Sequence, residues 1–213
     1  MDDPGVPRDD LALSLRYIRA VNRRLGGVSS LLFHLHGWSR DWPKGRPITL
    51  LDIATGSADL PQAIRAAHPN ASVVGLDNHP ATLAFARSVV SDPDITLVQG
   101  DALKLPFEDK SFDRVTCTLF LHHLPEELIV KSLAEMNRVC RGKVVVADLI
   151  RSRRALAWIT LFTLGSSAMI RHDSRASVRH ALTIPEMTTL AARAELKDYT
   201  VRRTFGHRML LHW

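Results

Sequence analysis

Short apolar runs alternate with helical segments along residues 48–150, and this alternation limits the fold more than any other feature of the sequence. Five runs rich in Val, Ile and Leu are predicted as strands, at 48–54, 71–77, 95–101, within 111–120 and at 143–150. Strands that are apolar throughout are buried on both faces, which is typical of parallel sheets covered by helices. The sequence therefore predicts an α/β fold built from parallel βαβ units.

The segments between and after these strands complete the predicted fold. Helices are expected at 59–67, 80–90, 125–139, 154–170 and about 185–194, with a loop from 170 to about 183. Two closing strands, about 196–204 and 207–213, are joined near Gly206 and bring the sheet to seven strands. The last of these strands is expected to be antiparallel to the others.

The N-terminal segment has a different pattern. Residues 11–36 carry apolar positions at helical spacing, which Gly26-Gly27 divides into two helices, and 37–47 contain the Gly and Pro of a linker. We expect residues 1–47 to form an N-terminal helical cap and linker, followed by one α/β domain over 48–213.

Composition is that of an ordinary globular protein. Of the 213 residues, 46% are hydrophobic and 23% charged, which excludes a disordered or fibrous chain. Cys117 and Cys140 lie in apolar runs without metal-ligand spacing, so we predict buried free thiols and a cytoplasmic protein. The acidic N-terminus lacks the pattern of a signal peptide. The apolar run 155–170 would span only about 24 Å as a helix, too short to cross a membrane.

Three carboxylates lie at the carboxyl ends of three consecutive predicted strands. Asp52, Asp77 and Asp101 are separated by 25 and 24 residues, about one βα unit each. Ligands of open α/β sheets bind beyond the carboxyl ends of the strands, so these side chains are expected to line one crevice. The alternatives are a turn residue for Asp101 and plain loop polarity for Asp77.

The loop after the first strand favours a cofactor that has a ribose but no phosphate. Asp77 is placed to accept hydrogen bonds from both ribose hydroxyls, and Ala54, Gly56 and Ala58 allow close backbone approach. A nicotinamide cofactor would favour G-x-G-x-x-G, whereas Asp59 brings negative charge to the position of pyrophosphate. S-adenosylmethionine, with a positive centre and a free amine, fits better. Asp59 has a second reading as a helix cap.

This order of segments resembles the class I S-adenosylmethionine-dependent methyltransferases. LDIATGSADLP resembles the first motif of that family, GLDNHPATLAFAR the acidic end of its second strand, and GDALKLPFEDKSFDRVTCTLFLHHL its third to fourth strands. The resemblance covers residues 48–150 and implies a Rossmann-like, seven-stranded, mostly parallel sheet with helices on both faces. It is similar to the group that contains the ubiquinone and menaquinone biosynthesis methyltransferases. DLIRSRRA and RHDSRASVRHALT resemble a bacterial subgroup that modifies polyketides or alkylresorcinols.

The resemblance also implies roles for individual residues. It implies a cofactor site made by Asp52, Ala54, Thr55, Gly56, Asp77, Asn78, Asp101, Ala102, Thr118 and Leu119. Asp52 would support the first loop and the methionine amine, Asp77 would bind the ribose, and Asp101 would reach the adenine amine. Many members have Gly where this chain has Ala54 and Ala58. The resemblance further implies that 154–184 form a substrate lid.

Two histidines follow the fourth predicted strand, where the transferred methyl group is expected to point. Either His122 or His123 is a candidate base, because a free imidazole has a pKa of about 6.5 and accepts a phenolic proton near neutral pH. The alternative is that one or both pack the loop or contact the cofactor. No carboxylates stand at ligand spacing from them, so no metal site is predicted.

The acceptor side of the site is less defined. Trp158 and Phe162 are candidates for an apolar acceptor pocket, and His172 and Arg175 for polar contacts to the acceptor; core packing and solvated loop charge are the alternatives. If these residues line the site, the acceptor is a small hydrophobic aromatic molecule such as a phenol, resorcinol, quinol or polyketide, methylated on oxygen or carbon.

Positive charge is concentrated in the last third of the chain. Residues 151–213 hold 11 cations and 4 anions, whereas 1–150 hold 17 and 18. This excess leaves open a methyltransferase acting on RNA or protein, although the chain lacks the Asn/Asp-Pro-Pro-Tyr/Phe sequence common among base methylases and an aromatic-interleaved basic stretch. It equally suits an acidic acceptor or peripheral contact with an anionic membrane. Monomer and homodimer both remain open.

Overall fold

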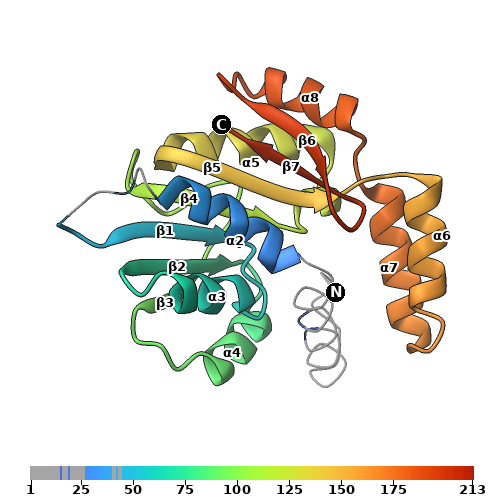
Figure 1. Cartoon of the computed structure of the whole chain (residues 1–213), viewed down its shortest axis with the longest axis horizontal. Helices are drawn as coiled ribbons and strands as arrows, with labels where there is room; N and C mark the ends of the chain where they lie inside the picture. The colour runs from blue at the N-terminus through green and yellow to red at the C-terminus, as the bar shows by residue number, and fades with distance from the viewer. Residues whose placement is uncertain (1–14, 16–18, 20–26, 40–41, 43–44) are drawn as a thin grey trace.

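Seven strands form a single mixed sheet in the computed structural model, which describes residues 15, 19, 27–39, 42 and 45–213 (Figure 1). The strands are β1 (Ile48–Ile53), β2 (Ala71–Asp77), β3 (Ile95–Gln99), β4 (Phe112–Thr118), β5 (Cys140–Leu149), β6 (Thr200–Thr204) and β7 (Arg208–His212). They lie in the order β3-β2-β1-β4-β5-β7-β6. The first five are parallel, and β7 is antiparallel to both β5 and β6. The predicted fold class is confirmed.

Helices connect the strands and cover the two faces of the sheet. They are α2 (Gly27–Trp38), α3 (Asp59–Ala67), α4 (Pro80–Val89), the short η2 (Leu121–His123), α5 (Glu126–Val139), α6 (Arg153–Phe162), α7 (Ala168–His180) and α8 (Ile184–Arg193). Helices α2 and α3 pack with each other on one face, and α5 packs with α8 on the other. The right-handed βαβ connections of parallel strands produce this two-sided cover.

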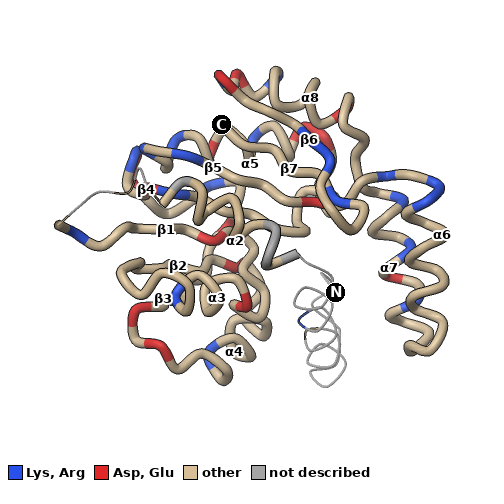
Figure 2. The backbone as a smooth tube through the Cα atoms, viewed as in Figure 1, with Lys and Arg blue, Asp and Glu red and all other residues tan. Residues whose placement is uncertain are grey.

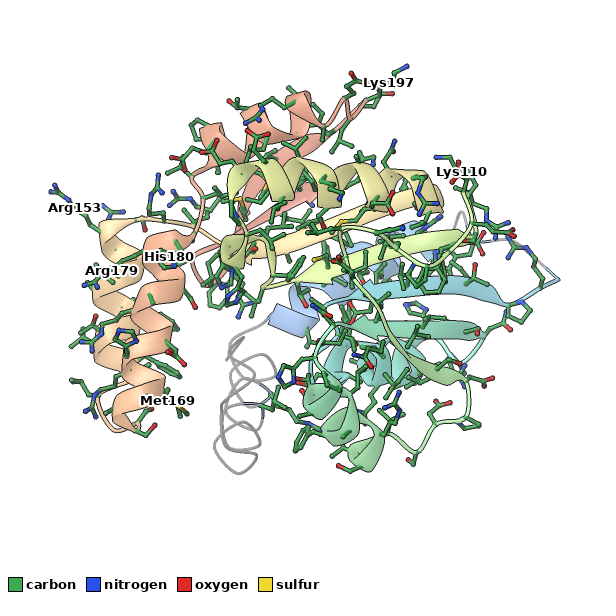
Figure 3. The ribbon with its side chains drawn as sticks, turned by 180° about the vertical axis from the view of Figure 1, so that it is seen from behind. Lys110, Arg153, Met169, Arg179, His180 and Lys197 are labelled. Carbon is green, nitrogen blue, oxygen red and sulfur yellow. The ribbon has the colours of Figure 1, made fainter. Side chains whose placement is uncertain are left out.

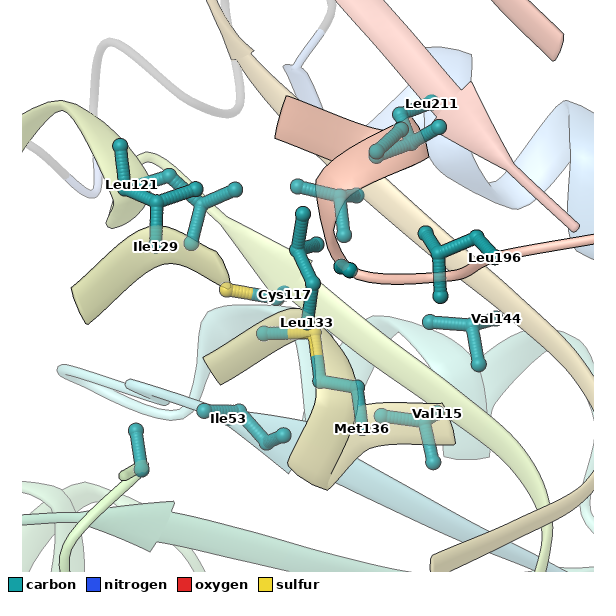
Figure 4. Packing of buried hydrophobic residues seen from close by; sticks show 14 of the residues in the cluster. Ile53, Val115, Cys117, Leu121, Ile129, Leu133, Met136, Val144, Leu196 and Leu211 are labelled. Atoms are coloured by element: carbon teal, nitrogen blue, oxygen red, sulfur yellow. The ribbon is translucent and has the colours of Figure 1, made fainter. Parts of the chain in front are cut away.

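Alternate residues of the central strand supply the two cores. In β1, Ile48 and Leu50 belong to the cluster beneath α2 and α3, whereas Leu51 and Ile53 belong to the larger cluster beneath α5 and α8. Figure 4 shows part of the larger cluster, in which Cys117 of β4 is packed among aliphatic side chains. Cys117 and Cys140 are buried free thiols, as the sequence predicts.

The segment after β5 differs from its prediction. Instead of one helix over 154–170 and a loop to 183, two helices, α6 and α7, form a hairpin that extends from the body (Figure 1). The break falls at Gly165 and Ser166, and the Ser167 side chain caps α7 by accepting the Ile170 N–H. Small and hydroxyl residues favour helix ends. The prediction missed this helix end because the surrounding run, 155–170, is apolar on both sides of it. No helix of the described residues is long and apolar enough to cross a membrane.

The central strand offers a test of the core. Leu51→Ala removes a side chain that is 0% exposed in β1, so we expect the free energy of unfolding to fall by about 2–5 kcal/mol. Urea denaturation followed by circular dichroism measures this change. Phe33→Ala on α2 is the control, because the Phe33 side chain is exposed and its removal is expected to cost less than about 0.5 kcal/mol. Equal losses in the two variants would contradict the placement of Leu51.

Candidate cofactor and catalytic site

The loop between β1 and α3 has an unusual backbone. Ala54, Gly56 and Ala58 adopt φ values of 55°, 56° and 56°, in the left-handed region that costs a non-glycine residue about 1–2 kcal/mol. Hydrogen bonds hold this shape: the Thr55 N–H donates to the Leu76 carbonyl at 3.0 Å, and the Ala58 N–H to the Thr55 carbonyl at 2.9 Å. A Cβ on Gly56 would meet no atom of the described residues within 4 Å. The loop therefore presents its backbone to open space at the carboxyl edge of the sheet.

Asp52 lies beneath this loop. Its carboxylate accepts hydrogen bonds from the Thr55 hydroxyl and the Thr116 hydroxyl, both at 2.8 Å. Burial raises the pKa of Asp52 to about 7 against these two hydrogen bonds, and the charges of Asp77 and Asp59 add to the rise. Asp52 thus supports the loop from inside the sheet. A charge bound above the loop would change the pKa of its carboxyl group.

Asp77 ends β2 beside the same loop. Its carboxylate accepts the Gly56 N–H at 2.9 Å and the His79 N–H at 3.0 Å, which links the loops after β1 and β2. Asn78 follows it and is exposed, and its carbonyl accepts a hydrogen bond from the Gln99 amide. The ends of β1, β2 and β3 are therefore brought together, as the spacing of the carboxylates predicts.

Asp101, after β3, has the turn role that we weighed as an alternative. The Leu103 N–H donates to Asp101 Oδ1 at 2.8 Å, so the carboxylate stabilises its own turn, while the residue remains exposed. Ala102 is buried in the larger core. After β4, Thr118 and Leu119 are half-buried, and Leu119 has a φ of 53°. Strained backbone thus follows both β1 and β4, and such residues gather at functional sites.

Asp59 does not act as the helix cap that we considered. Ala58 occupies the N-cap position of α3 and makes no side-chain cap. The Asp59 carboxylate instead forms an ion pair with Arg19 at 2.9 Å and accepts the Ser57 hydroxyl at 3.0 Å. This contact joins Arg19 to the first residue of α3.

His122 and Asp148 form a buried pair at the same edge of the sheet. His122 Nδ1 lies 2.6 Å from Asp148 Oδ1, and the His122 N–H donates to Asp148 Oδ2 at 3.2 Å. Burial alone would raise the pKa of Asp148, but the charge and hydrogen bond of His122 and the backbone N–H of Leu149 hold it below its ordinary value. An ionised carboxylate only accepts, so His122 Nδ1 carries the hydrogen that is directed at Asp148.

Sequence reasoning missed Asp148. It lies 26 residues from His122 in the chain, and only the parallel pairing of β4 with β5 brings the two strand ends together. The signal was present, because Asp148 is a single carboxylate at the end of the apolar run KVVVADLI, as Asp52 is in the first strand. Arg208 of β7 pairs with Leu149 in the sheet and adds a buried cation whose pKa is lowered by burial, against the charge of Asp148.

His123 differs from His122 in its surroundings. Its residue is exposed, whereas His122 is buried, and the two ring centroids lie 4.1 Å apart. Both belong to η2, which α7 contacts. The two histidines thus lie against α7, and the structure separates a buried, carboxylate-bound imidazole from an exposed one.

The predicted acceptor residues lie on the hairpin. Trp158 and Phe162 of α6 stack on each other, with ring centroids 5.0 Å apart, and Trp158 also approaches His207 of the β6–β7 turn. His172 and Arg175 lie on α7 rather than in the loop predicted there. His172 is exposed, and Arg175 Nε donates to the Arg171 carbonyl. Across the described residues, no three His, Cys, Asp or Glu side chains gather in a way that could hold a metal ion.

Comparisons with known proteins agree with this arrangement. Residues 50–143 match the model of a methyltransferase domain. A demethylmenaquinone methyltransferase of Staphylococcus aureus is 37% identical over 108 residues, which are 50% of this chain and 44% of the relative. The matched stretch is therefore less than half of that protein.

Solved structures match more of the chain at lower identity. The plantazolicin methyltransferase BpumL in complex with SAH has a TM-score of 0.73 at 14% identity, over 96% of this chain and 94% of that one. A SAM-dependent methyltransferase from Aquifex aeolicus has a TM-score of 0.65 at 15% identity, over 94% and 96%. At such identities the likeness concerns the fold. The domain match over residues 50–143 and the likeness in fold agree with the similarity to class I S-adenosylmethionine-dependent methyltransferases that the sequence motifs indicate.

Proposed function

We propose that this protein transfers a methyl group from S-adenosylmethionine to a small hydrophobic aromatic acceptor of phenol, resorcinol, quinol or polyketide type. The observation that carries the proposal is the His122–Asp148 pair, which lies at the carboxyl edge of the sheet beside the loops after β1 and β4. An acceptor hydroxyl needs a base at this position, whether the methyl group goes to oxygen or to an activated ring carbon.

The residues at the strand ends fit the cofactor. The left-handed loop offers backbone N–H groups and an open Gly56, and the edge carries carboxylates instead of a phosphate-binding glycine turn. Asp77 would hold the ribose, Asn78, Asp101 and Ala102 would contact the adenine, and Ala54, Thr55, Thr118 and Leu119 would lie along the methionyl part. When bound, S-adenosylmethionine supplies a methyl group on a good sulfonium leaving group, so the protein mainly aligns and desolvates the reactants.

The proposed base is His122. Asp148 fixes its tautomer with Nδ1–H directed at the carboxylate, so Nε2 accepts the proton of the acceptor hydroxyl. Asp148 then stabilises the resulting imidazolium as a positioning residue. The exposed His123, whose ring is tilted by 36° against that of His122, would line the same side and orient the acceptor.

The α6–α7 hairpin and the N-terminal segment would enclose the acceptor. Trp158 and Phe162 provide aromatic surface, and His172 and Arg175 provide polar contacts on α7. In this proposal residues 1–47 form the cap and 154–184 the lid of the domain over 48–213. The curated relatives named for demethylmenaquinone are consistent with a quinol-type acceptor.

A labelled-cofactor screen tests the function directly. The full chain is incubated with methyl-labelled S-adenosylmethionine and, in parallel, with phenols, resorcinols, quinols, pyrones and RNA. We expect label in one of the aromatic classes. Label in RNA alone would replace this proposal with the nucleic-acid alternative that the basic last third of the chain suggests, and cofactor binding without any transfer would point to a non-catalytic protein.

Asp77 gives the first mutational prediction. Asp77→Ala removes both acceptors for the ribose hydroxyls, and hydrogen bonds to a charged group contribute about 1.5–3 kcal/mol each, so we expect at least a hundredfold weaker cofactor binding. Isothermal titration calorimetry with S-adenosylhomocysteine measures the change. Asp94→Ala, which removes an exposed carboxylate paired with Arg65, is the control and is expected to bind normally. Unchanged affinity in Asp77→Ala would refute the cofactor assignment.

The raised pKa of Asp52 gives a second prediction. At about pH 6 the free protein holds Asp52 protonated, because its pKa is about 7. A cofactor with two positive groups above the loop favours the carboxylate, so binding releases a proton and the affinity rises as the pH increases toward 8. Calorimetry at pH 6 in buffers of different ionisation enthalpy detects the proton. Asp52→Asn abolishes the release; a wild-type protein that releases none would contradict this placement of the cofactor.

The base assignment gives a third prediction. His122→Ala is expected to lower kcat by about 10²–10⁴-fold with cofactor affinity unchanged, since the proton-transfer step alone is affected. Asp148→Asn keeps the size of the side chain and is expected to lower kcat with little effect on the acceptor KM. Steady-state kinetics with the acceptor found in the screen measures both, and His123→Ala separates base from lining. If His122→Ala and His123→Ala both retain full turnover, neither residue is the base.

A further inference from the structure

The free end of the α6–α7 hairpin exposes apolar side chains. Leu161, Phe162 and Leu164 are 69%, 45% and 63% exposed, and they are three of the five exposed large hydrophobic residues among those the structure describes. A shallow groove lined by Leu156, Ala157, Thr160, Leu161 and Arg153 continues this apolar surface along α6. Figure 3 shows Met169 at the free end and Arg153, Arg179 and His180 at the end joined to the body.

Positive charge is concentrated on the two helices of the hairpin. Five arginines belong to the two helices, Arg153, Arg154, Arg171, Arg175 and Arg179, against one acidic residue, Asp173 (Figure 2). Arg171 and Arg175 donate to backbone carbonyls, and neither forms an ion pair with another described residue. Within the described part of the chain, Arg153, Arg154 and Arg179 form no ion pair. The hairpin therefore carries a strong local excess of positive charge.

We propose that the α6–α7 hairpin docks this protein on an anionic phospholipid surface, with Leu161 and Leu164 in the interface and the positive charge of Arg153, Arg154, Arg171 and Arg179 in the potential of the lipid phosphates. Eight residues separate Arg153 from Leu161, about 12 Å along a helix, and interfacial apolar groups enter the bilayer by about 5–10 Å. The arginines nearer the free end thus reach the headgroups, and those at the base lie within the range of the surface potential.

The order of apolar and charged residues favours lipid over other partners. A nucleic acid would bind the arginines but would gain little from three exposed aliphatic and aromatic side chains at the end of a projection. A second copy of this chain would meet the same positive charge and be repelled. An anionic bilayer alone complements both features, and the contact would be peripheral, because no described helix is able to span the membrane.

Co-sedimentation of the full chain with phospholipid vesicles tests this proposal. We expect binding to vesicles of equal parts phosphatidylglycerol and phosphatidylcholine, at least tenfold weaker binding to phosphatidylcholine alone, and a loss of binding on addition of salt. Leu161→Ser with Leu164→Ser, and separately Arg153→Gln with Arg179→Gln, are each expected to weaken binding by about tenfold. These four side chains are exposed, so the variants keep their fold, which circular dichroism verifies.

Matched controls define the outcome. Phe33→Ser on α2 and Arg203→Gln on β6 replace exposed residues outside the hairpin and are expected to bind as the wild type does. Equal binding to neutral and anionic vesicles, or wild-type binding by the Leu161/Leu164 variant, would overturn the proposal.

Two other outcomes would assign the surface to another partner. If the wild type forms a dimer in analytical ultracentrifugation, does not bind vesicles, and the Leu161/Leu164 variant is a monomer, the surface belongs to a second copy. An RNA gel shift lost only in the arginine variant, again without vesicle binding, would assign it to nucleic acid. Vesicle binding needs no acceptor, so its failure is distinct from a failure of methyl transfer.

Discussion

Strands β1 and β4 are neighbours at the centre of the sheet, and the Asp52 carboxylate links both of them to the loop after β1. Its oxygens accept one hydroxyl from Thr116 of β4 and one from Thr55 of the loop, each at 2.8 Å. Gly75 of β2 makes room for this arrangement, because a Cβ at that position would lie 2.9 Å from Thr55 Oγ1. The left-handed turn after β1 therefore rests on a polar contact inside the sheet.

The carboxylates at the two edges of the parallel sheet have different hydrogen-bond donors. At the amino edge, Arg46 forms a bidentate ion pair with Asp113 at 2.7 and 2.6 Å, and the resulting hydrogen bonds lower the pKa of Asp113. At the carboxyl edge, Asp52 receives hydroxyls and Asp77 receives backbone N–H groups. The first arrangement neutralises charge and fixes the strands; in the second, hydroxyl and backbone N–H donors hold the carboxylates in place.

The strands were predictable because apolar runs bounded by polar turns are a local signal. The observed bounds agree with the predicted ones within a few residues; β3 ends earlier, at Gln99, and β5 begins earlier, at Cys140. The hairpin was not predictable from periodicity, since Gly165 and Ser166 interrupt an apolar run whose two halves both have helical spacing. The His122–Asp148 contact also lay beyond the sequence pattern, because it depends on which strands are neighbours. The carboxylates after β1, β2 and β3 were found because their spacing repeats with the βα unit.

The positive φ angles of Ala54 and Ala58 have a consequence for how such proteins are recognised. Both alanines adopt the backbone that glycine adopts without strain, so the surrounding hydrogen bonds, and not the residue type, determine the turn. A search that requires glycines in this loop would pass over this chain although its backbone has the sought geometry. The backbone conformation of this loop is thus compatible with alanine as well as with glycine.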